Sequence, residues 1–260
     1  MPTHIFGAPA DPIAVEELAA AYDVPVLFDA AHALGSTAAG RPVGGFGSVE
    51  VFSLTPTKVL VAGEGGLVAT NDQELAARIR IGRNYADPGN YDTRFSGLNA
   101  RMSEFHAAMA LASLERFDDA LARRRQIAFR YRKLLADVPG VQIQAIDVAD
   151  ESTFKDLSIA IDPEVFGLTR DQLVQVLVAE EIETRNYFDP PVHRHAAYAH
   201  LDPVDLPVTE QVSSQIVSLP IYIDLSDDDV GRIAEAVHSA HEHADRILGV
   251  LNDPTMRGIL

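Results

Sequence analysis

Residues 49–68, VEVFSLTPTKVLVAGEGGLV, predict a short apolar strand that ends at Ser53, a turn that carries Lys58, and a glycine-rich bend that leads into a second strand. An enzyme that uses lysine as an imine-forming nucleophile holds it on a rigid support in a walled pocket, where partial desolvation lowers its pKa. The chain has three lysines against eighteen arginines, so a lysine in its most glycine-punctuated stretch is a candidate nucleophile. The alternative is a solvated turn lysine between two strands.

The segment 25–35, PVLFDAAHALG, places Asp29 directly after a buried strand. In open α/β sheets, ligands bind outside the carboxyl ends of the strands, so a cofactor contact is expected at this residue. A buried aspartate suits a pyridinium, because it keeps the ring nitrogen of pyridoxal 5'-phosphate protonated and the ring an electron sink; a lysine is its usual companion. Asp29 and Lys58 together therefore predict a pyridoxal phosphate site.

Three motifs carry a resemblance to a known family: DAAH at 29–32, FSLTPTK at 52–58 and GEGG at 63–66. They resemble the sugar aminotransferases of the DegT/DnrJ/EryC1/StrS family, which have the type I fold of pyridoxal phosphate enzymes. The resemblance covers nearly the whole chain. It continues through residues 83–85, 97–104 and 187–193.

The resemblance implies an α/β fold with two domains. Residues 1–125 would form part of the large, cofactor-binding domain of fold type I, and residues 126–260 a smaller C-terminal α/β domain. In the family, the strand expected near His4 lies well inside the large domain, so the resemblance also implies that an N-terminal segment is absent. A second polypeptide, a rearranged dimer or a degenerate remnant would each be consistent with this.

The resemblance also assigns roles to individual side chains. Lys58 and Asp29 would be the catalytic pair, Ser53 would bind the cofactor phosphate, and His32 would contact the side of the ring that bears its hydroxyl. The other assignments are Asn99 or Arg101, which would reach the phosphate across a dimer, and Tyr187 and His193, which would lie on the substrate side.

Composition limits the other functions. The chain has 260 residues, 47% of them hydrophobic, and a net charge of −17, which disfavours nucleic acid and anionic membranes as partners. It has no cysteine, and the pair His193 and His195 lacks a third ligand at a recognisable spacing, so no metal site is expected. We find no apolar run of membrane-spanning length and no signal peptide, and we expect a soluble, cytoplasmic protein.

Local patterns predict several helices. Asp11 and Pro12 mark one helix start, Asn71 and Asp72 precede a second, and Ser103 with Glu104 opens a third, longer helix. In this third helix, apolar residues at helical spacing predict core packing; they are Phe105, Ala108, Met109, Leu111, Ala112 and Leu114. The arginine run 123–125 is interpreted as a solvated helix face, and Lys155 as a solvated lysine.

The resemblance implies transfer of an amino group from glutamate or glutamine to a nucleotide-linked keto sugar or a keto cyclitol, by a homodimer that could need a separate N-terminal polypeptide. Within the fold, the alternative is a pyridoxal phosphate-dependent sugar dehydratase. Dehydratases of the family carry another residue, typically histidine, at the position of Lys58, so its presence favours amino transfer. The alternative from another class is a non-catalytic scaffold or partner subunit. Leu54 and Thr55 depart from the family pattern, which leaves the substrate open.

Overall fold

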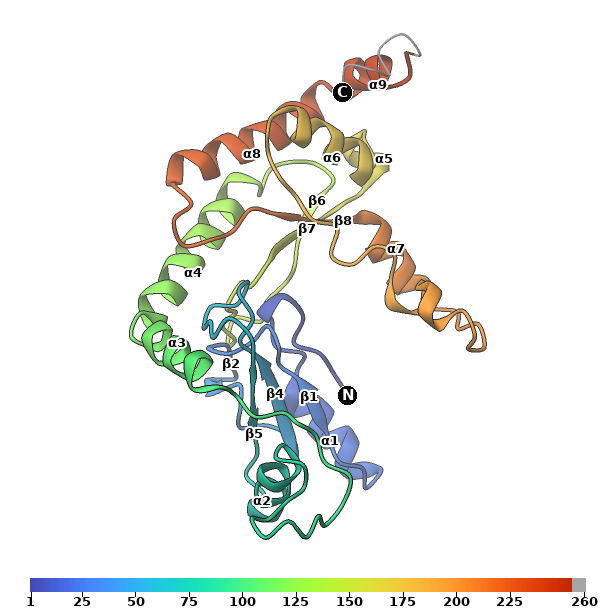
Figure 1. The fold of residues 1–260 in the computed structure, drawn as a ribbon. Helices are drawn as coiled ribbons and strands as arrows, with labels where there is room; N and C mark the ends of the chain where they lie inside the picture. The colour runs from blue at the N-terminus through green and yellow to red at the C-terminus, as the bar shows by residue number, and fades with distance from the viewer. Residues whose placement is uncertain (254–260) are drawn as a thin grey trace. The chain divides into compact units, whose positions relative to one another are not determined.

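The computed structural model describes residues 1–253, which form two compact units (Figure 1). The first unit contains residues 1–123 and 146–155, and the second contains residues 124–145 and 156–253. The segment 146–155 thus returns to the first unit, whereas a single boundary near residue 125 assigns it to the second. The division into a cofactor-binding domain and a small domain stays a prediction.

The first unit is built on a three-stranded sheet of β1 (Leu27–Asp29), β4 (Val49–Ser53) and β5 (Gly66–Ala69), in the order β1-β4-β5. β1 runs parallel to β4, and β4 runs antiparallel to β5 (Figure 1). At the outer edge of β1, the main chain of Asp29 bonds to Pro2 and His4, each over 2.9 Å. A two-stranded ribbon, β2 (Thr37–Ala38) and β3 (Arg41–Pro42), follows β1.

The two faces of this sheet differ in burial. Phe28, Glu50 and Phe52 share one face, and their side chains are fully or almost fully buried. α1 (Pro12–Ala21) packs on that face through Val15 and Ala19 (Figure 1). The opposite face carries Asp29, Val51 and Ser53, because side chains alternate along a strand, and it also presents Leu27 and Val68 to solvent. The side chains of Asp29 and Ser53, the residues predicted at the strand ends, therefore lie on this second face of the sheet.

The helix starts predicted in the first unit are confirmed. Asp11 accepts a hydrogen bond from the Ala14 N–H at the start of α1, with Pro12 in the first turn. Asp72 caps α2 (Gln73–Gly82), and Ser103 caps α3 (Glu104–Leu114). Each cap satisfies a backbone N–H that the first helical turn leaves without a partner.

The prediction that the apolar face of α3 packs in a core is wrong. Phe105 is 86% exposed, and Met109, Leu111 and Leu114 are each about half exposed or more. The helical period itself is present, but this unit provides no surface that covers those side chains. α3 is followed by the separate helix α4 (Phe117–Leu134).

The second unit contains an antiparallel sheet in the order β6-β7-β8, formed by Val141–Ile143, Leu157–Ile161 and Ile216–Leu219. Its helices include α6 (Arg170–Ala179), α7 (Pro207–Gln215), α8 (Asp227–Glu242) and α9 (Ala244–Leu251) (Figure 1). Short helical segments are α5 (Pro163–Phe166), η2 (Val192–Arg194) and η3 (Ala196–Tyr198); in the first unit, η1 spans Ile5–Gly7. Figure 1 shows α6 and α8 side by side; α6 contributes buried leucine side chains, and α8 contributes buried valine and isoleucine side chains.

Two basic residues interpreted as solvated are buried instead. Arg124 is only 8% exposed on α4, where burial lowers the pKa of its guanidinium and the charge of Asp156 opposes that shift. Lys155 is also 8% exposed. The periodicity of the arginine run did not separate its buried member from the half-buried ones, Arg123 and Arg125.

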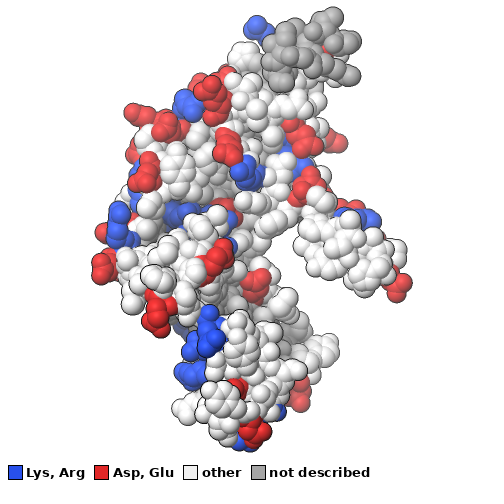
Figure 2. All heavy atoms as spheres, in the orientation of Figure 1, with Lys and Arg blue, Asp and Glu red and all other residues white. Residues whose placement is uncertain are grey.

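No helix within residues 1–253 combines the length and the apolar character that crossing a membrane requires. Figure 2 shows acidic side chains scattered over the visible face, with basic side chains among them, as the net charge of −17 leads one to expect.

Candidate active site

Asp29 and Ser53 are the last residues of two neighbouring parallel strands. Asp29 pairs in register with Val51, and Ser53 follows Val51 by two positions, so both side chains belong to the same face and the same edge of the sheet. This is the carboxyl edge, where open α/β sheets bind ligands.

The carboxylate of Asp29 is held by its immediate surroundings. Its Oδ1 accepts a hydrogen bond from the Ala31 N–H over 3.0 Å, and its main chain is bonded on both sides to Pro2 and His4. The residue is half-buried. The carboxylate therefore has a fixed position at the sheet edge, in a partly desolvated setting.

Lys58 lies on a loop that leaves and rejoins this edge. The Lys58 N–H donates to the Thr55 carbonyl over 3.0 Å, and at the base of the loop Leu54 bonds to Gly65 over 3.0 Å and to Ala62 over 2.8 Å. A Cβ atom on Gly66 would lie 2.7 Å from the Phe52 carbonyl oxygen, so the bend requires glycine. Lys58 is half-buried. These bonds hold the loop with Lys58 closed between the end of β4 and the start of β5.

Two hydroxyls stand together where β4 ends. Ser53 Oγ lies 3.3 Å from Thr55 Oγ1, and the Thr55 N–H donates to Ser53 Oγ over 3.5 Å. Hydroxyl groups can turn their hydrogens toward an incoming oxyanion. The pair is chemically suited to a phosphate.

His32 lies in the turn that follows β1. Its Nδ1 accepts a hydrogen bond from the Phe6 N–H over 3.1 Å, and its main-chain carbonyl accepts one from the Thr153 hydroxyl over 2.6 Å. The ring of Phe6 lies nearly parallel to the imidazole. His32 is thus fixed through both its ring and its backbone.

The structure reveals two further residues near these positions that sequence reasoning missed. His4 is fully buried, its Nδ1 accepts a hydrogen bond from the Ala10 N–H over 2.9 Å, and its ring stacks on Phe28. Burial lowers the pKa of His4, and the negative charge of Asp29 partly opposes this. Thr153 is the other, and it is also fully buried. His4 could have been noticed as a histidine in an apolar stretch, but nothing in the sequence around Thr153 links it to His32.

Asn99 and Arg101 lie in the first unit, on the exposed chain between α2 and α3. Asn99 forms a single bridge with Asn84, and the Arg101 guanidinium lies 5.3 Å from the centre of the Tyr85 ring. These contacts tie both residues to the loop that follows α2. The cofactor contact predicted for them would be made in a partner subunit and stays a prediction.

Tyr187 and His193 belong to the second unit. The Tyr187 ring lies 5.1 Å from that of Phe188, and His193 Nε2 lies 3.0 Å from Glu210 Oε1. The hydrogen bonds from His193 and Arg194 lower the pKa of Glu210. The substrate contacts predicted for this segment stay predictions.

A buried arginine holds the segment that contains Tyr187. Arg170 is 2% exposed and bonds to the Asp189 carboxylate and to the carbonyls of Ser213 and Ile216, over 3.2 and 2.9 Å. The Ser213 hydroxyl in turn donates to the Phe188 carbonyl over 2.6 Å. The irregular chain from Phe188 to Asp189 is therefore fixed to α6 and α7.

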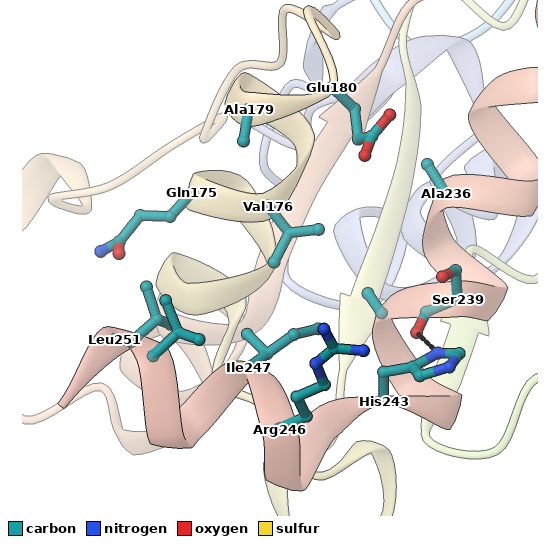
Figure 3. A pocket seen from close by; sticks show the side chains of 12 residues that line it. Gln175, Val176, Ala179, Glu180, Ala236, Ser239, His243, Arg246, Ile247 and Leu251 are labelled. Carbon is teal, nitrogen blue, oxygen red and sulfur yellow. Dashed lines mark hydrogen bonds between the residues drawn. The ribbon is translucent and has the colours of Figure 1, made fainter. Parts of the chain in front are cut away.

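The second unit also has a cavity of about 400 Å³ between α6, α8 and α9 (Figure 3). Its walls are mostly apolar, with Glu180, His243 and Arg246 among the lining side chains. None of the predicted site residues lines it. Within residues 1–253, no three histidine or acidic side chains gather as metal ligands would.

Comparison with known proteins identifies the family. The profile of the DegT/DnrJ/EryC1/StrS aminotransferase family matches residues 1–238. The chain belongs to this family. The resemblance of the sequence motifs is thereby confirmed, and so is the fold expected from it.

Individual members of the DegT/DnrJ/EryC1/StrS family agree with this assignment. GDP-perosamine synthase of Caulobacter vibrioides is 34% identical over 240 residues, which cover 91% of this chain and 64% of that protein. A Streptomyces venezuelae enzyme, dTDP-3-amino-3,4,6-trideoxy-alpha-D-glucose transaminase, is 34% identical over 95% of this chain and 64% of its own length. The crystal structure of DesI with its TDP-sugar product matches with a TM-score of 0.90 and 36% identity, over 96% of this chain and 64% of DesI. The chain thus spans a little under two thirds of these relatives.

Proposed function

We propose that the protein is a pyridoxal phosphate-dependent aminotransferase that acts on a nucleotide-linked keto sugar. The observation that carries this proposal is that Asp29 and Ser53 end two neighbouring strands at one edge of the first sheet, and that the loop with Lys58 follows Ser53. Membership of the aminotransferase family supports it. In this reading the chain supplies the lysine and the carboxylate of the site.

The residues at this edge fit pyridoxal phosphate in kind. The group needs an amine for its carbonyl carbon, a carboxylate for its ring nitrogen and donors for its phosphate, and the edge offers Lys58, Asp29 and the hydroxyls of Ser53 and Thr55. His32, beside Asp29 in the chain, would meet the ring oxygen. When bound, the cofactor supplies an electron sink for the charge that develops at the substrate carbon.

Each side chain has a distinct task in this reading. Lys58 Nζ would bind the cofactor carbonyl carbon. It would also hold and move the proton that passes between the substrate carbon and the cofactor carbon during amino transfer. Asp29 would hold the proton on the ring nitrogen, a task for which its carboxylate is positioned by the Ala31 N–H. Ser53 would orient the phosphate, and with it the whole ring.

The names of relatives support the substrate class. Two are named as a GDP-perosamine synthase and a dTDP-amino sugar transaminase, and a third as dTDP-4-amino-4,6-dideoxy-D-glucose transaminase of Shigella dysenteriae. We therefore place a nucleotide-linked keto sugar before a keto cyclitol as the amino acceptor. Glutamate or glutamine as the donor stays a proposal from the family resemblance. Amino transfer remains preferred over dehydration because Lys58 is present.

We propose a second copy of this chain as the partner that completes the site. The sheet face with Asp29 leaves Leu27, Val51 and Val68 exposed, and the exposed chain around Asn99 and Arg101 would contact the neighbouring subunit. Light scattering coupled to gel filtration should give a dimer in cytoplasmic salt conditions. The proposal would be overturned if the chain were a monomer and dimerised or bound cofactor only together with a separate polypeptide. That polypeptide would match the remaining third of the relatives.

The test of the function is a titration of the purified chain with pyridoxal phosphate, followed by borohydride reduction and peptide mapping. We expect saturable visible absorbance and a reduced pyridoxyl group on Lys58. Lys58→Ala should lose both, whereas Lys133→Ala, at an exposed position of α4, should keep both. Absence of binding in the dimer would favour the alternative of a non-catalytic partner subunit.

A second measurement separates amino transfer from dehydration. The loaded protein is incubated with labelled glutamate and a panel of nucleotide-linked keto sugars, and the products are identified by mass spectrometry. Transfer of the ¹⁵N label to the sugar supports the proposal. Loss of water from the sugar without nitrogen transfer would establish a dehydratase instead.

A further inference from the structure

A short segment from far along the chain packs against the turn that carries His32. We name residues 150–155 the strap. The strap lies in the first unit, although the residues on either side of the segment 146–155 belong to the second. Glu151 forms a two-way backbone bridge with Thr37, and the Lys155 N–H donates to the Phe6 carbonyl over 3.0 Å.

The central contact is a buried chain of hydroxyl groups. The Thr153 hydroxyl donates to the His32 carbonyl over 2.6 Å, while the Thr153 N–H donates to Ser36 Oγ over 3.1 Å. The Ser36 hydroxyl then donates to the Gly7 carbonyl over 2.6 Å. Thr153 is fully buried and Ser36 almost so. Every link is close to ideal length, so the turn after β1 is clamped to the turn at residues 5–7.

The clamp leaves little room for adjustment. A Cβ atom on Gly7 would lie 2.0 Å from Thr153 Oγ1 and 3.0 Å from the His32 carbonyl oxygen, and Gly7 has a φ of +95°. Only glycine tolerates both the conformation and the approach. Phe6 directly precedes Gly7 in the same turn, so the strap also sets the position of the Phe6 N–H.

That N–H determines which nitrogen of His32 carries hydrogen. Because the Phe6 N–H donates to Nδ1, this nitrogen acts as an acceptor, and the neutral imidazole must carry its hydrogen on Nε2. A proton on Nδ1 would face another donor and break the hydrogen bond. The ring is thus kept as a donor at Nε2.

We propose that the strap, through Thr153 and Ser36, positions His32 as a neutral Nε2–H donor for the ring oxygen of the cofactor. Thr153 is a positioning residue in this proposal, because it acts through His32. The last step rests on the proposed function, since it needs pyridoxal phosphate at Asp29 and Lys58. The tautomer of His32 does not depend on the cofactor and can be measured without it.

The first test is ¹⁵N NMR of the histidine rings in the cofactor-free protein at pH 7.5, with the His32 signal assigned by its loss in His32→Asn. We expect a protonated Nε2 and an unprotonated Nδ1. Thr153→Ser, which keeps the hydroxyl, should give the same pattern, whereas Thr153→Val should give a mixture of tautomers. A protonated Nδ1 in the unchanged protein, or an unaltered pattern in a folded Thr153→Val protein, would overturn the proposal.

The second test uses a matched pair at His32. Asparagine can place an oxygen near Nδ1 and accept from Phe6, and glutamine can place an N–H near Nε2. We expect His32→Asn to keep its thermal stability but to bind pyridoxal phosphate about fivefold to tenfold more weakly, and His32→Gln to show the opposite pattern. Equal loss of affinity in both variants would reject the donor role. The expected tautomer together with no modification of Lys58 would instead reject the proposed function.

Discussion

Asp29 and Ser53 lie on one face of the first sheet because Asp29 pairs in parallel register with Val51, two positions before Ser53. The relationship follows from strand geometry alone, since side chains two residues apart share a face. It gives the proposed site one carboxylate and one hydroxyl that cannot drift apart without disrupting the sheet.

Replacing Asp29 by asparagine should reduce turnover by two orders of magnitude or more, on the order of what removal of a key electrostatic group costs. Asparagine Oδ1 can still accept from the Ala31 N–H, so the local fold should persist. Stopped-flow single-turnover rates, with unfolding curves alongside, provide the measurement. Asp202→Asn, at an exposed position of the second unit, is the control. Near-normal turnover in Asp29→Asn would exclude Asp29 as the partner of the ring nitrogen.

Ser53→Ala should weaken pyridoxal phosphate binding by about tenfold, because one charge-assisted hydrogen bond to the phosphate is lost. The same variant should bind pyridoxal, which has no phosphate, as well as the unchanged protein does. Equilibrium titration with both ligands measures the difference. If the affinities for the two ligands fell equally, Ser53 would be acting on the loop of Lys58 rather than on the phosphate.

Glu50 should make the unchanged protein less stable as the pH rises. Its side chain is fully buried, Oε1 accepts from the Phe46 N–H over 2.6 Å, and burial raises its pKa above the ordinary value of 4.5. The folded protein therefore binds this proton more tightly than the unfolded chain. The stabilisation is complete below pH 4.5, and it declines by up to about 1.4 kcal/mol per pH unit until the folded pKa is reached.

Glu50→Gln removes this titration, so its stability relative to the unchanged protein should increase with pH across the same window. Urea unfolding at half-unit pH steps measures the difference. Glu17→Gln, at an exposed position of α1, should run parallel to the unchanged protein. A constant difference between Glu50→Gln and the unchanged protein would show that Glu50 titrates alike in both states.

Arg170→Met should lower the free energy of unfolding by about 3 kcal/mol, because the substitution leaves Asp189 and the carbonyls of Ser213 and Ile216 without their donor. Arg185→Met is the matched control. Its ion pair with Glu183 is exposed, so its loss should cost at most about 1 kcal/mol. Chemical denaturation of both variants compares them, and equal effects would show that burial of Arg170 adds nothing to its contacts.

Structural features that depend only on a few adjacent residues could be predicted from the sequence. Asp11, Asp72 and Ser103 each mark a helix start, because a cap needs only the residues that follow it. The strand from Val49 to Ser53 was likewise predicted with its correct end. The carboxyl edge could be located from these local signals, and the motifs supplied the family.

Features that depend on distant residues could not be predicted. Thr153 and His32 are 121 positions apart, and neither local sequence indicates the other. The helical period of α3 reports an apolar stripe but not what covers it, so Phe105 was placed in a core although it is 86% exposed. Arg124 and its half-buried neighbours share one residue type, and only the fold separates them.

The path of the strap has a practical consequence for dissecting the molecule. A polypeptide cut after residue 125 would contain every strand of the first sheet, and by length it would pass for an independent domain. It would nevertheless lack Thr153, and with it the group that closes the turn at His32. The first unit of this chain is discontinuous, so grafting, swapping or separate expression must carry residues 146–155 along with it.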